Sequence, residues 1–388
     1  MKEGPRIEKA KWLNGADSPV MFMVDDFTNV WIDLNGNGRV DPGEDWGHAL
    51  DGPGSAFRYL TEEVLRSCPA VKTTFFTPMA RVPVIREHGY RAHFGPINEN
   101  EETARFFASV HRDERFEIAY HGLSHGVSGA RTEDFVHEWV AYGSLEEAME
   151  TVGRGKEIYF EVFGEYPRGG KYCGYGYNSF SDESIDKSGF LWWCRKWDRG
   201  QAGVDDTERF DVKYFGENRV IDIPSTVYGA MFNLQGRNKL GRAFKRPVVL
   251  RRGREEIDRL LEGKLVISIQ EHLSPARTDG RRQTPNTLDD RESLKFLFDY
   301  LGSKNVWFCT GTELAEYVYS RDNTVIEEKG RTFLLDARFE RDLKSRLITL
   351  VIKDERVQQI RAPDGGTIPG RQGLFTFPAV SGRYDLLE

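Results

Sequence analysis

The sequence has few cysteines, no long apolar run and no excess of positive charge, and each absence excludes a class of protein. Its four cysteines lie far apart and show neither the spacing of a thiolate metal site nor that of a disulfide framework: Cys68, Cys173, Cys194 and Cys309. No apolar segment is long enough to span a membrane. Because 61 acidic residues outnumber 54 basic ones, the net charge of -7 gives no electrostatic reason to expect nucleic acid or an anionic membrane as a partner.

The first twenty residues are charged and contain no apolar run of the kind that forms the centre of a signal peptide. Together with the scarce cysteines, this favours a reducing, cytoplasmic location and leaves an extracytoplasmic one open. The partner to expect is therefore a carbohydrate or another small molecule. The sequence does not indicate an oligomeric state.

Seven short apolar runs, rich in β-branched and aromatic residues, predict buried strands: 20–24, 73–77, 116–120, 189–194, 220–224, 265–269 and 306–310. Amphipathic, charged stretches between several of them predict helices: 102–112, 144–164, 253–264 and 287–302. This alternation predicts an α/β fold, with a parallel sheet closed into a distorted (β/α) barrel over residues 1–320. Beyond it, strand-like runs separated by PDGG and VSGR turns predict a small all-β, sandwich-like domain over 321–388.

The segment DLNGNGRVDPGE, at 33–44, matches a calcium-binding loop of the EF-hand type. A glycine stands at the sixth position, where the chain must turn sharply, and the expected ligands are Asp33, Asn35, Asn37, Arg39 through its carbonyl, Asp41 and Glu44. The strand-like run before the loop and Pro42 within it argue against a helix-loop-helix. We expect a structural calcium ion here. The alternative is a turn rich in Asn and Gly that binds nothing.

Two polar clusters follow predicted strands, at the end where a parallel barrel collects its catalytic groups. Asp25 and Asp26 come directly after the first apolar run, where adjacent carboxylates are costly unless they bind a cation or share a task. His121 and His125 follow the third run, four residues apart, and can converge on one ion if the segment begins to coil. Two imidazoles and one carboxylate leave coordination positions open for water and substrate.

Five motifs, VDDFT, HGLSH, PRGGKYCGYGYN, VIDIP and LVISIQEH, occur in an order that resembles polysaccharide deacetylases, the carbohydrate esterases of family four. The resemblance covers about residues 18–320. It implies that Asp25 is the catalytic base and that Asp26, His121 and His125 hold one divalent ion, zinc by preference. Phe27 replaces the glycine that usually follows the two aspartates, so we expect a reshaped cleft.

The later motifs imply further roles in catalysis. Arg168 matches the arginine that holds the base, His272 matches the histidine that acts as general acid, and Asp222 resembles the acidic residue that tunes that histidine. Gly169 and Gly170 replace the usual prolines, which predicts a looser third loop. The activity implied is removal of an acetyl or other acyl group from an amino sugar or glycan. The aromatic side chains of Tyr172 and Tyr175 are candidates to stack on its sugar rings.

Two other functions stay open at this stage. The chain can be a glycan-binding protein on a deacetylase scaffold that has lost turnover. It can also be an iron oxygenase or isomerase, since two histidines and one carboxylate suit iron as well as zinc. Retention of a separate base and acid, Asp25 and His272, favours hydrolysis. The sequence does not decide whether the acyl bond is an amide or an ester.

Overall fold

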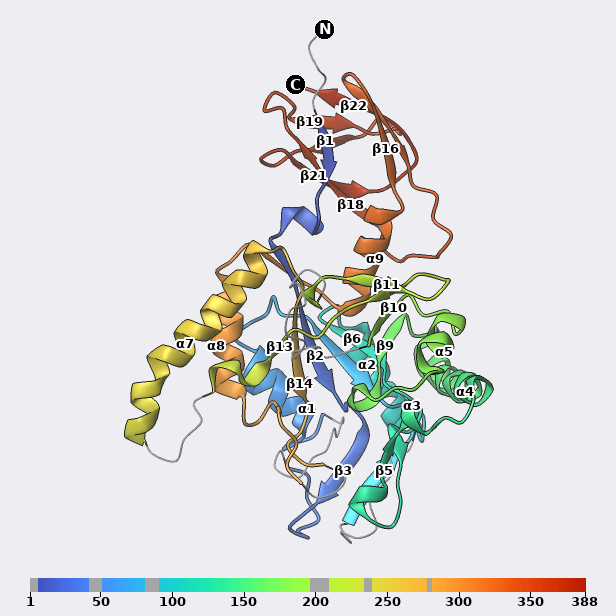
Figure 1. Ribbon diagram of the computed structural model, residues 1–388, viewed down its shortest axis with the longest axis vertical. Helices are drawn as coiled ribbons and strands as arrows, with labels where there is room; N and C mark the ends of the chain where they lie inside the picture. The colour runs from blue at the N-terminus through green and yellow to red at the C-terminus, as the bar shows by residue number, and fades with distance from the viewer. Residues whose placement is uncertain (1–5, 42–50, 81–90, 196–208, 234–238, 278–280) are drawn as a thin grey trace. The chain divides into compact units, whose positions relative to one another are not determined.

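The computed structural model describes residues 6–41, 51–80, 91–195, 209–233, 239–277 and 281–388 (Figure 1). The chain divides into a large unit, Val20–Lys304 with Phe308–Gly311, and a small unit. The small unit is formed by the segment up to Pro19, by Asn305–Trp307 and by Thr312–Glu388. It therefore includes an N-terminal strand and most of a helix that lie outside the predicted 321–388 domain.

A mostly parallel sheet forms the centre of the large unit. Eight parallel strands follow one another in the order β12-β10-β9-β6-β4-β2-β14-β13, β11 adds an antiparallel edge beside β12, and β15 also pairs with β2. The bounds are β2 Ser18–Asp25, β4 Thr73–Thr77, β6 Phe116–Tyr120, β9 Gly169–Lys171, β10 Trp192–Cys194, β11 Lys213–Phe215, β12 Val220–Asp222, β13 Val227–Tyr228, β14 Ile267–His272 and β15 Val306–Phe308. Among the described strands β11 and β13 remain edges, so the sheet is a curled half-barrel rather than a closed barrel.

The strands form where the sequence is apolar on both faces. Every residue of β2, β4 and β6 is buried, as parallel sheets covered on both sides require. All seven predicted runs contain a strand, which confirms the α/β class. The strands β9 and β13 were not predicted, because GGK and VY are too short and β9 has no β-branched residue.

Helices flank this sheet (Figure 1): α1 Ala56–Tyr59, which continues as a π-helical turn over Leu60–Leu65, α2 Glu101–Arg112, α3 Glu138–Ala141, α4 Leu145–Phe163, α5 Ser181–Lys187, α7 Lys239–Glu262 and α8 Arg291–Gly302. The predicted helices correspond to α2, α4, α8 and the second half of α7. Side chains of Asn100 and Ser144 accept hydrogen bonds from the N–H groups of Thr103 and Glu147, which caps α2 and α4. Two antiparallel strand pairs, β3 Asn29–Asp33 with β5 Arg91–Gly95 and β7 Gly126–Val127 with β8 Val136–His137, complete the large unit.

Two antiparallel sheets and helix α9 (Gly311–Asp322) form the small unit. The sheets have the orders β16-β17-β22-β19-β20 and β1-β18-β21, with bounds β1 Ile7–Lys9, β16 Val325–Lys329, β17 Thr332–Asp336, β18 Leu347–Ile352, β19 Gln359–Arg361, β20 Thr367–Pro369, β21 Leu374–Pro378 and β22 Gly382–Leu387. Both sheets contribute to one apolar cluster, in which the rings of Phe333 and Tyr384 stack with centroids 4.9 Å apart. The predicted all-β character of the C-terminal part is confirmed.

Candidate metal and catalytic site

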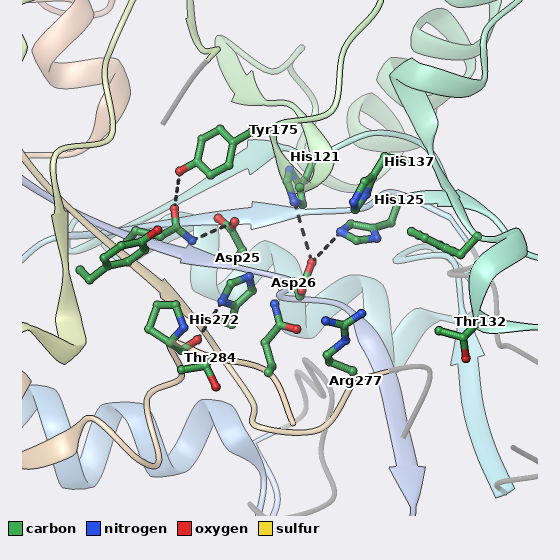
Figure 2. A pocket seen from close by; sticks show the side chains of 16 residues that line it. Asp25, Asp26, His121, His125, Thr132, His137, Tyr175, His272, Arg277 and Thr284 are labelled. Carbon is green, nitrogen blue, oxygen red and sulfur yellow. Dashed lines mark hydrogen bonds and ion pairs between the residues drawn. The ribbon is translucent and has the colours of Figure 1, made fainter. Parts of the chain in front are cut away.

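Two strand ends and a turn bring the predicted metal ligands together (Figure 2). Asp26 directly follows β2 and His121 directly follows β6, so parallel strands deliver both side chains to one edge of the sheet. His125 lies in the turn between β6 and β7. Asp26 and His125 have φ values of 64° and 65°, in the left-handed region that non-glycine residues rarely adopt. Such conformations gather at functional sites, where the surrounding structure enforces them.

His121 presents one nitrogen to this site. Its Nδ1 lies 2.9 Å from the carbonyl oxygen of Lys171, and its Nε2 is buried and has no hydrogen-bond partner among the described residues. Burial lowers the pKa of His121 to about 4, although the Asp25 carboxylate acts to raise it, so the ring is neutral at pH 7. A carbonyl that accepts from Nδ1–H leaves the Nε2 lone pair to bind a metal, as in most histidine ligands.

The other two ligand candidates lie at distances suited to a shared ion. Asp26 Oδ1 is 3.2 Å from His125 Nε2 and 3.8 Å from His121 Nε2, and it makes no hydrogen bond of good geometry among the described residues. Ligand atoms about 2.0–2.1 Å from a tetrahedral zinc ion lie about 3.3 Å from one another. Burial acts to raise the pKa of Asp26, but His125 and His272 outweigh it and hold the pKa below its usual range. The residues present therefore suit a divalent ion.

Cys173 also approaches the two histidines, which its sequence spacing did not indicate. Possible ligand atoms of His121, His125 and Cys173 all lie within 4.8 Å of one another. The Cys173 thiol, however, donates to the carbonyl oxygen of His121 at 3.0 Å, and burial raises its pKa well above its ordinary value. A protonated thiol is a poor ligand. The ionised carboxylate of Asp26 is therefore the better third ligand.

Asp25 lies beside the candidate metal ligands, and its two carboxylate oxygens have different surroundings. Its Oδ2 accepts hydrogen bonds from Lys171 Nζ at 2.6 Å and from Gln270 Nε2 at 3.0 Å. Its Oδ1 is buried without a partner among the described residues. Burial acts to raise the pKa of Asp25, but neighbouring cations, foremost Lys171, hold it below its ordinary value. An ionised carboxylate with one unused oxygen can accept a proton.

His272 ends β14 and stands opposite Asp25 in the register of the sheet. Its Nδ1 lies 2.8 Å from the carbonyl oxygen of Pro285. If Nδ1–H donates to that carbonyl, Nε2 is the nitrogen left for the cavity. In Figure 2 the His272 ring lies below the two aspartates, whereas the rings of His121 and His125 lie above them.

A cavity of about 310 Å³ is lined by Asp25, Asp26, His121, His125 and His272 together with residues from neighbouring loops. Phe135 and His137, at the β7–β8 hairpin, line it, as do Arg277 and Pro285 from the segment after β14. Burial, and then His125, lower the pKa of His137 to about 4. Tyr175 lines the cavity as well, and its hydroxyl donates to Gln270 Oε1 at 2.8 Å. The site is therefore a pocket in which the carboxylates and imidazoles lie beside aromatic side chains and one arginine.

Three residues predicted for the site lie elsewhere, and none of them lines the cavity. The Asp222 carboxylate binds Arg195, with Nε 2.9 Å from Oδ2, because β12 lies near the far end of the sheet from β14. Tyr172 is fully buried, and its hydroxyl donates to Asp182 at 2.8 Å. Arg168 precedes β9, and the cation on Asp25 is instead Lys171.

Four residues at or beneath the cavity were not predicted from the sequence: Lys171, Gln270, His137 and Arg277. Gln270 precedes His272 by two residues on β14, so strand alternation could have placed both on one face. Lys171 follows two glycines that were expected in a loop but form strand β9. His137 ends the short strand β8 and Arg277 follows β14, both outside the matched motifs, where no sequence signal marks them.

In the predicted calcium loop, side-chain oxygens accept hydrogen bonds from N–H groups of the same loop. The Asp33 carboxylate accepts hydrogen bonds from the N–H groups of Asn37 and Gly38, both at 3.0 Å, and Asn37 Oδ1 accepts from Arg39 N at 2.7 Å. Gly38 has a φ of 70°, which agrees with the sharp turn expected there. Glu44 lies outside the described residues. Calcium binding at this loop stays a prediction.

Within the part of the chain that the structure describes, no helix combines the length and the apolar character needed to cross a membrane.

Known families and curated proteins give no match to this chain. Among solved structures, a Mycobacterium smegmatis protein named as a polysaccharide deacetylase is 17% identical to this chain, with a TM-score of 0.47. The match covers 81% of this chain and 94% of that protein's chain. PuuE allantoinase is 16% identical, with 79% and 92% covered and a TM-score of 0.48. A family-four carbohydrate esterase pseudoenzyme from Bacillus anthracis is 13% identical, with 77% and 65% covered and a TM-score of 0.35. These names differ in activity, so they do not decide the function of this chain.

Proposed function

We propose that the chain is a metal-dependent hydrolase that removes an acetyl or other acyl group from an amino sugar or glycan. One observation carries the proposal. Three buried polar atoms without hydrogen-bond partners among the described residues, Asp25 Oδ1, Asp26 Oδ1 and His121 Nε2, belong to side chains that line one cavity. Buried polar atoms are almost always satisfied, because an unsatisfied one costs about 1–3 kcal/mol. A metal ion and a reacting water would satisfy all three.

Asp26, His121 and His125 would hold the ion, for which we propose zinc. When bound, the ion would polarise the acyl carbonyl and lower the pKa of water from about 15.7 toward about 7. The carbonyl oxygen of Lys171 fixes His121 by accepting from its Nδ1–H, which leaves Nε2 to bind the ion. The protein thus supplies a preformed set of donors whose protonation at neutral pH suits a divalent cation.

Asp25 is the proposed general base. Its Oδ2 is held by Lys171 and Gln270, so the carboxylate cannot rotate freely and Oδ1 is the oxygen that takes a proton from the attacking water. The adjacent position of Asp26 places the base next to the ion. An ionised Asp25 before the attack is consistent with the direction in which its neighbours shift its pKa.

His272 is the proposed general acid. Its Nδ1–H stays bound to the Pro285 carbonyl while Nε2–H of the imidazolium gives its proton to the departing amine or alcohol. Because His272 and Asp25 stand on neighbouring strands in register, the base and the acid face the same reacting centre. The proton taken by Asp25 and the proton given by His272 balance the hydrolysis.

Two rival functions use the same residues. An inactive glycan-binding protein needs no partnerless base, so Asp25 Oδ1 argues against it. An iron oxygenase or isomerase would use the same three ligands but no general acid at the position of His272. Metal identity, together with oxygen dependence of any turnover, separates the iron enzyme from the hydrolase.

The test is acetate release from a panel of N- and O-acetylated oligosaccharides and simple amides after zinc loading. We compare wild type with His121→Ala/His125→Ala and with His111→Ala, whose Nε2 contacts Glu165 outside the cavity. Release by wild type and His111→Ala but not by the double variant supports the proposal and identifies the bond class. Silence of wild type across the panel despite bound zinc favours a binding role instead.

A further inference from the structure

Lys171 is a fully buried cation that pairs with the carboxylate of Asp25. Its side chain has 0% exposure, and Nζ lies 2.6 Å from Asp25 Oδ2. The ammonium also donates to Gln270 Oε1 and lies over the Tyr175 ring, 4.3 Å from the centroid. Because the lysine ammonium has only donors, the amide oxygen of Gln270 must face Lys171. The NH₂ group of Gln270 is thereby turned toward Asp25. Lys171 and Gln270 therefore hold the Asp25 carboxylate in one orientation.

The close packing of strand β9 places this lysine. β9 pairs with β6 through Gly170 and Tyr120 and with β10 on its other side. A Cβ at Gly170 would lie 2.2 Å from the carbonyl oxygen of Tyr120, so only glycine permits this approach. The next residue is then Lys171, whose carbonyl accepts from the metal-ligand candidate His121 and whose ammonium binds Asp25. One residue thus contacts both a ligand and the base of the proposed site.

We propose that Lys171, and not Arg168, is the positioning residue of Asp25. This inference rests on the proposed function, in which Asp25 is the base. Lys171 and Gln270 together occupy Oδ2 and leave Oδ1 free to accept a proton from water. Arg168 does not line the cavity, and the hydrogen bonds that Asp25 Oδ2 accepts come from Lys171 and Gln270. The Lys171 ammonium bonds to Asp25 Oδ2 and not to Oδ1, so this side chain acts by orienting Asp25.

The alternative is that Lys171 merely neutralises a buried carboxylate for stability. In that case its loss would lower the melting temperature without a selective effect on turnover. Loss of a group that orients a reacting residue typically costs about 10- to 100-fold in rate. Such a loss appears in kcat with KM little changed, because the lysine does not touch the substrate.

The experiment is a double-mutant cycle with zinc-loaded Asp25→Asn, Lys171→Met and Asp25→Asn/Lys171→Met, on an acetylated substrate that wild type hydrolyses. We expect Lys171→Met to lower kcat by about 10- to 100-fold. In the Asp25→Asn background, the second change should cost less than about twofold, because the residue through which Lys171 acts is already inactive. A further loss of kcat in the double variant beyond that of Asp25→Asn would overturn the proposal.

Two comparisons control for folding and for the arginine. Lys156→Met removes a partly buried lysine of helix α4, which donates to the Ser188 carbonyl at the end of helix α5, and it should leave kcat unchanged. Arg168→Met should cost less kcat than Lys171→Met, and the reverse order would overturn the proposal. If Lys171→Met does not fold because Asp25 is left unpaired, the double variant, which removes both charges, still gives the decisive comparison with Asp25→Asn.

The outcomes separate this proposal from the proposed function. If Asp25→Asn binds zinc and retains full turnover, Asp25 is not the base, and both fail. If Asp25→Asn abolishes turnover while Lys171→Met retains it, the proposed function stands and the positioning role of Lys171 is refuted.

Discussion

Buried polar side chains differ in their hydrogen bonding between the cavity of the large unit and the core of the small unit. In the small unit, the buried carboxylate of Glu316 accepts hydrogen bonds from the N–H groups of Lys344 and Ser345 at 2.8 and 2.9 Å. Among the described residues of that unit, the hydroxyl of Ser320 is the one buried side-chain polar atom without a partner. At the cavity, Asp25, Asp26, His121 and His137 each keep such an atom.

The difference indicates which part of the chain carries the chemistry. A satisfied carboxylate, such as that of Glu316, contributes to stability and has no further atom to offer. Partnerless buried atoms cost stability, and at the cavity several of them belong to side chains that line one space, where a bound ion or water could use them. We therefore expect substitutions at the cavity to change metal binding and turnover, and substitutions in the small unit to change stability.

The largest effect should come from the third ligand. We expect Asp26→Ala to lose zinc and at least about 10³-fold in kcat/KM, because the transition-state charge depends on the ion. Cys173→Ser should keep its zinc, since the thiol is protonated and bound to a carbonyl. The zinc content of each dialysed variant shows whether Asp26 or Cys173 is the third ligand. Retention by Asp26→Ala together with loss by Cys173→Ser would replace the carboxylate with the thiolate in the ligand set.

The role of His272 should depend on the leaving group. We expect His272→Asn to lower kcat by about 10²–10⁴-fold for an N-acetyl substrate, because an amine must be protonated to leave. An activated aryl ester, whose phenolate leaves without a proton, should lose far less. Equal losses on both substrates would show that His272 is not the acid.

The contrast between the two units predicts that substitutions in the small unit change stability and not turnover. Ile348 is fully buried in the apolar cluster of that unit, so Ile348→Ala should cost about 2–5 kcal/mol in the free energy of unfolding. Denaturant titration gives this value. We expect kcat per zinc-loaded, folded molecule to equal that of wild type. A tenfold fall in that kcat would assign the small unit a part in catalysis.

The loop that contains Asp33 offers a smaller test of metal binding. If it binds calcium, adding calcium to chelator-treated protein should raise the melting temperature by a few degrees, since a ligand that binds only the folded state stabilises it. Asp33→Ala should not respond to calcium. An unchanged melting temperature in wild type would mean that the loop is only a turn.

The smallest expected effect is at Glu271, a fully buried residue of β14 whose side-chain oxygens lack partners among the described residues. Burial, and then Asp290, raise the pKa of Glu271 well above its ordinary value of 4.5. The folded state thus holds the proton more tightly, so stability is full below about pH 4.5 and falls as pH rises toward the folded pKa.

Glu271→Gln removes this loss. Its melting temperature should exceed that of wild type at pH 7, and the difference should vanish below pH 4. Glu102→Gln, an exposed change on α2, is the control and should show no such pH-dependent difference. A Glu271→Gln protein that is less stable than wild type at pH 7 would contradict the shift.

The sequence predicted those candidate site residues that directly follow an apolar strand. Asp25, Asp26, His121 and His272 all stand at the ends of runs whose burial was predicted, and parallel pairing then brings them to one edge. The same reasoning did not place Asp222, which also ends a strand. The order of strands in the sheet decides which ends meet, and nothing in a single sequence specifies that order.

The residues around the ligands were harder to predict for a local reason. Lys171 and Tyr172 are neighbours in one motif, and strand alternation sends only one of them toward the cavity edge. Because GGK does not read as a strand, that alternation was not visible, and Tyr172 was assigned to the substrate. His137 ends the two-residue strand β8 and Arg277 follows β14, and the positions of both at the cavity depend on tertiary packing.

Diffraction from zinc-loaded crystals at the zinc absorption edge tests the central claim most directly. We expect one anomalous peak about 2.0–2.2 Å from Asp26 Oδ1, His121 Nε2 and His125 Nε2. A peak bound to Cys173 Sγ without Asp26, or no peak in this cavity at full zinc loading, would contradict the proposed metal centre and the hydrolysis that depends on it.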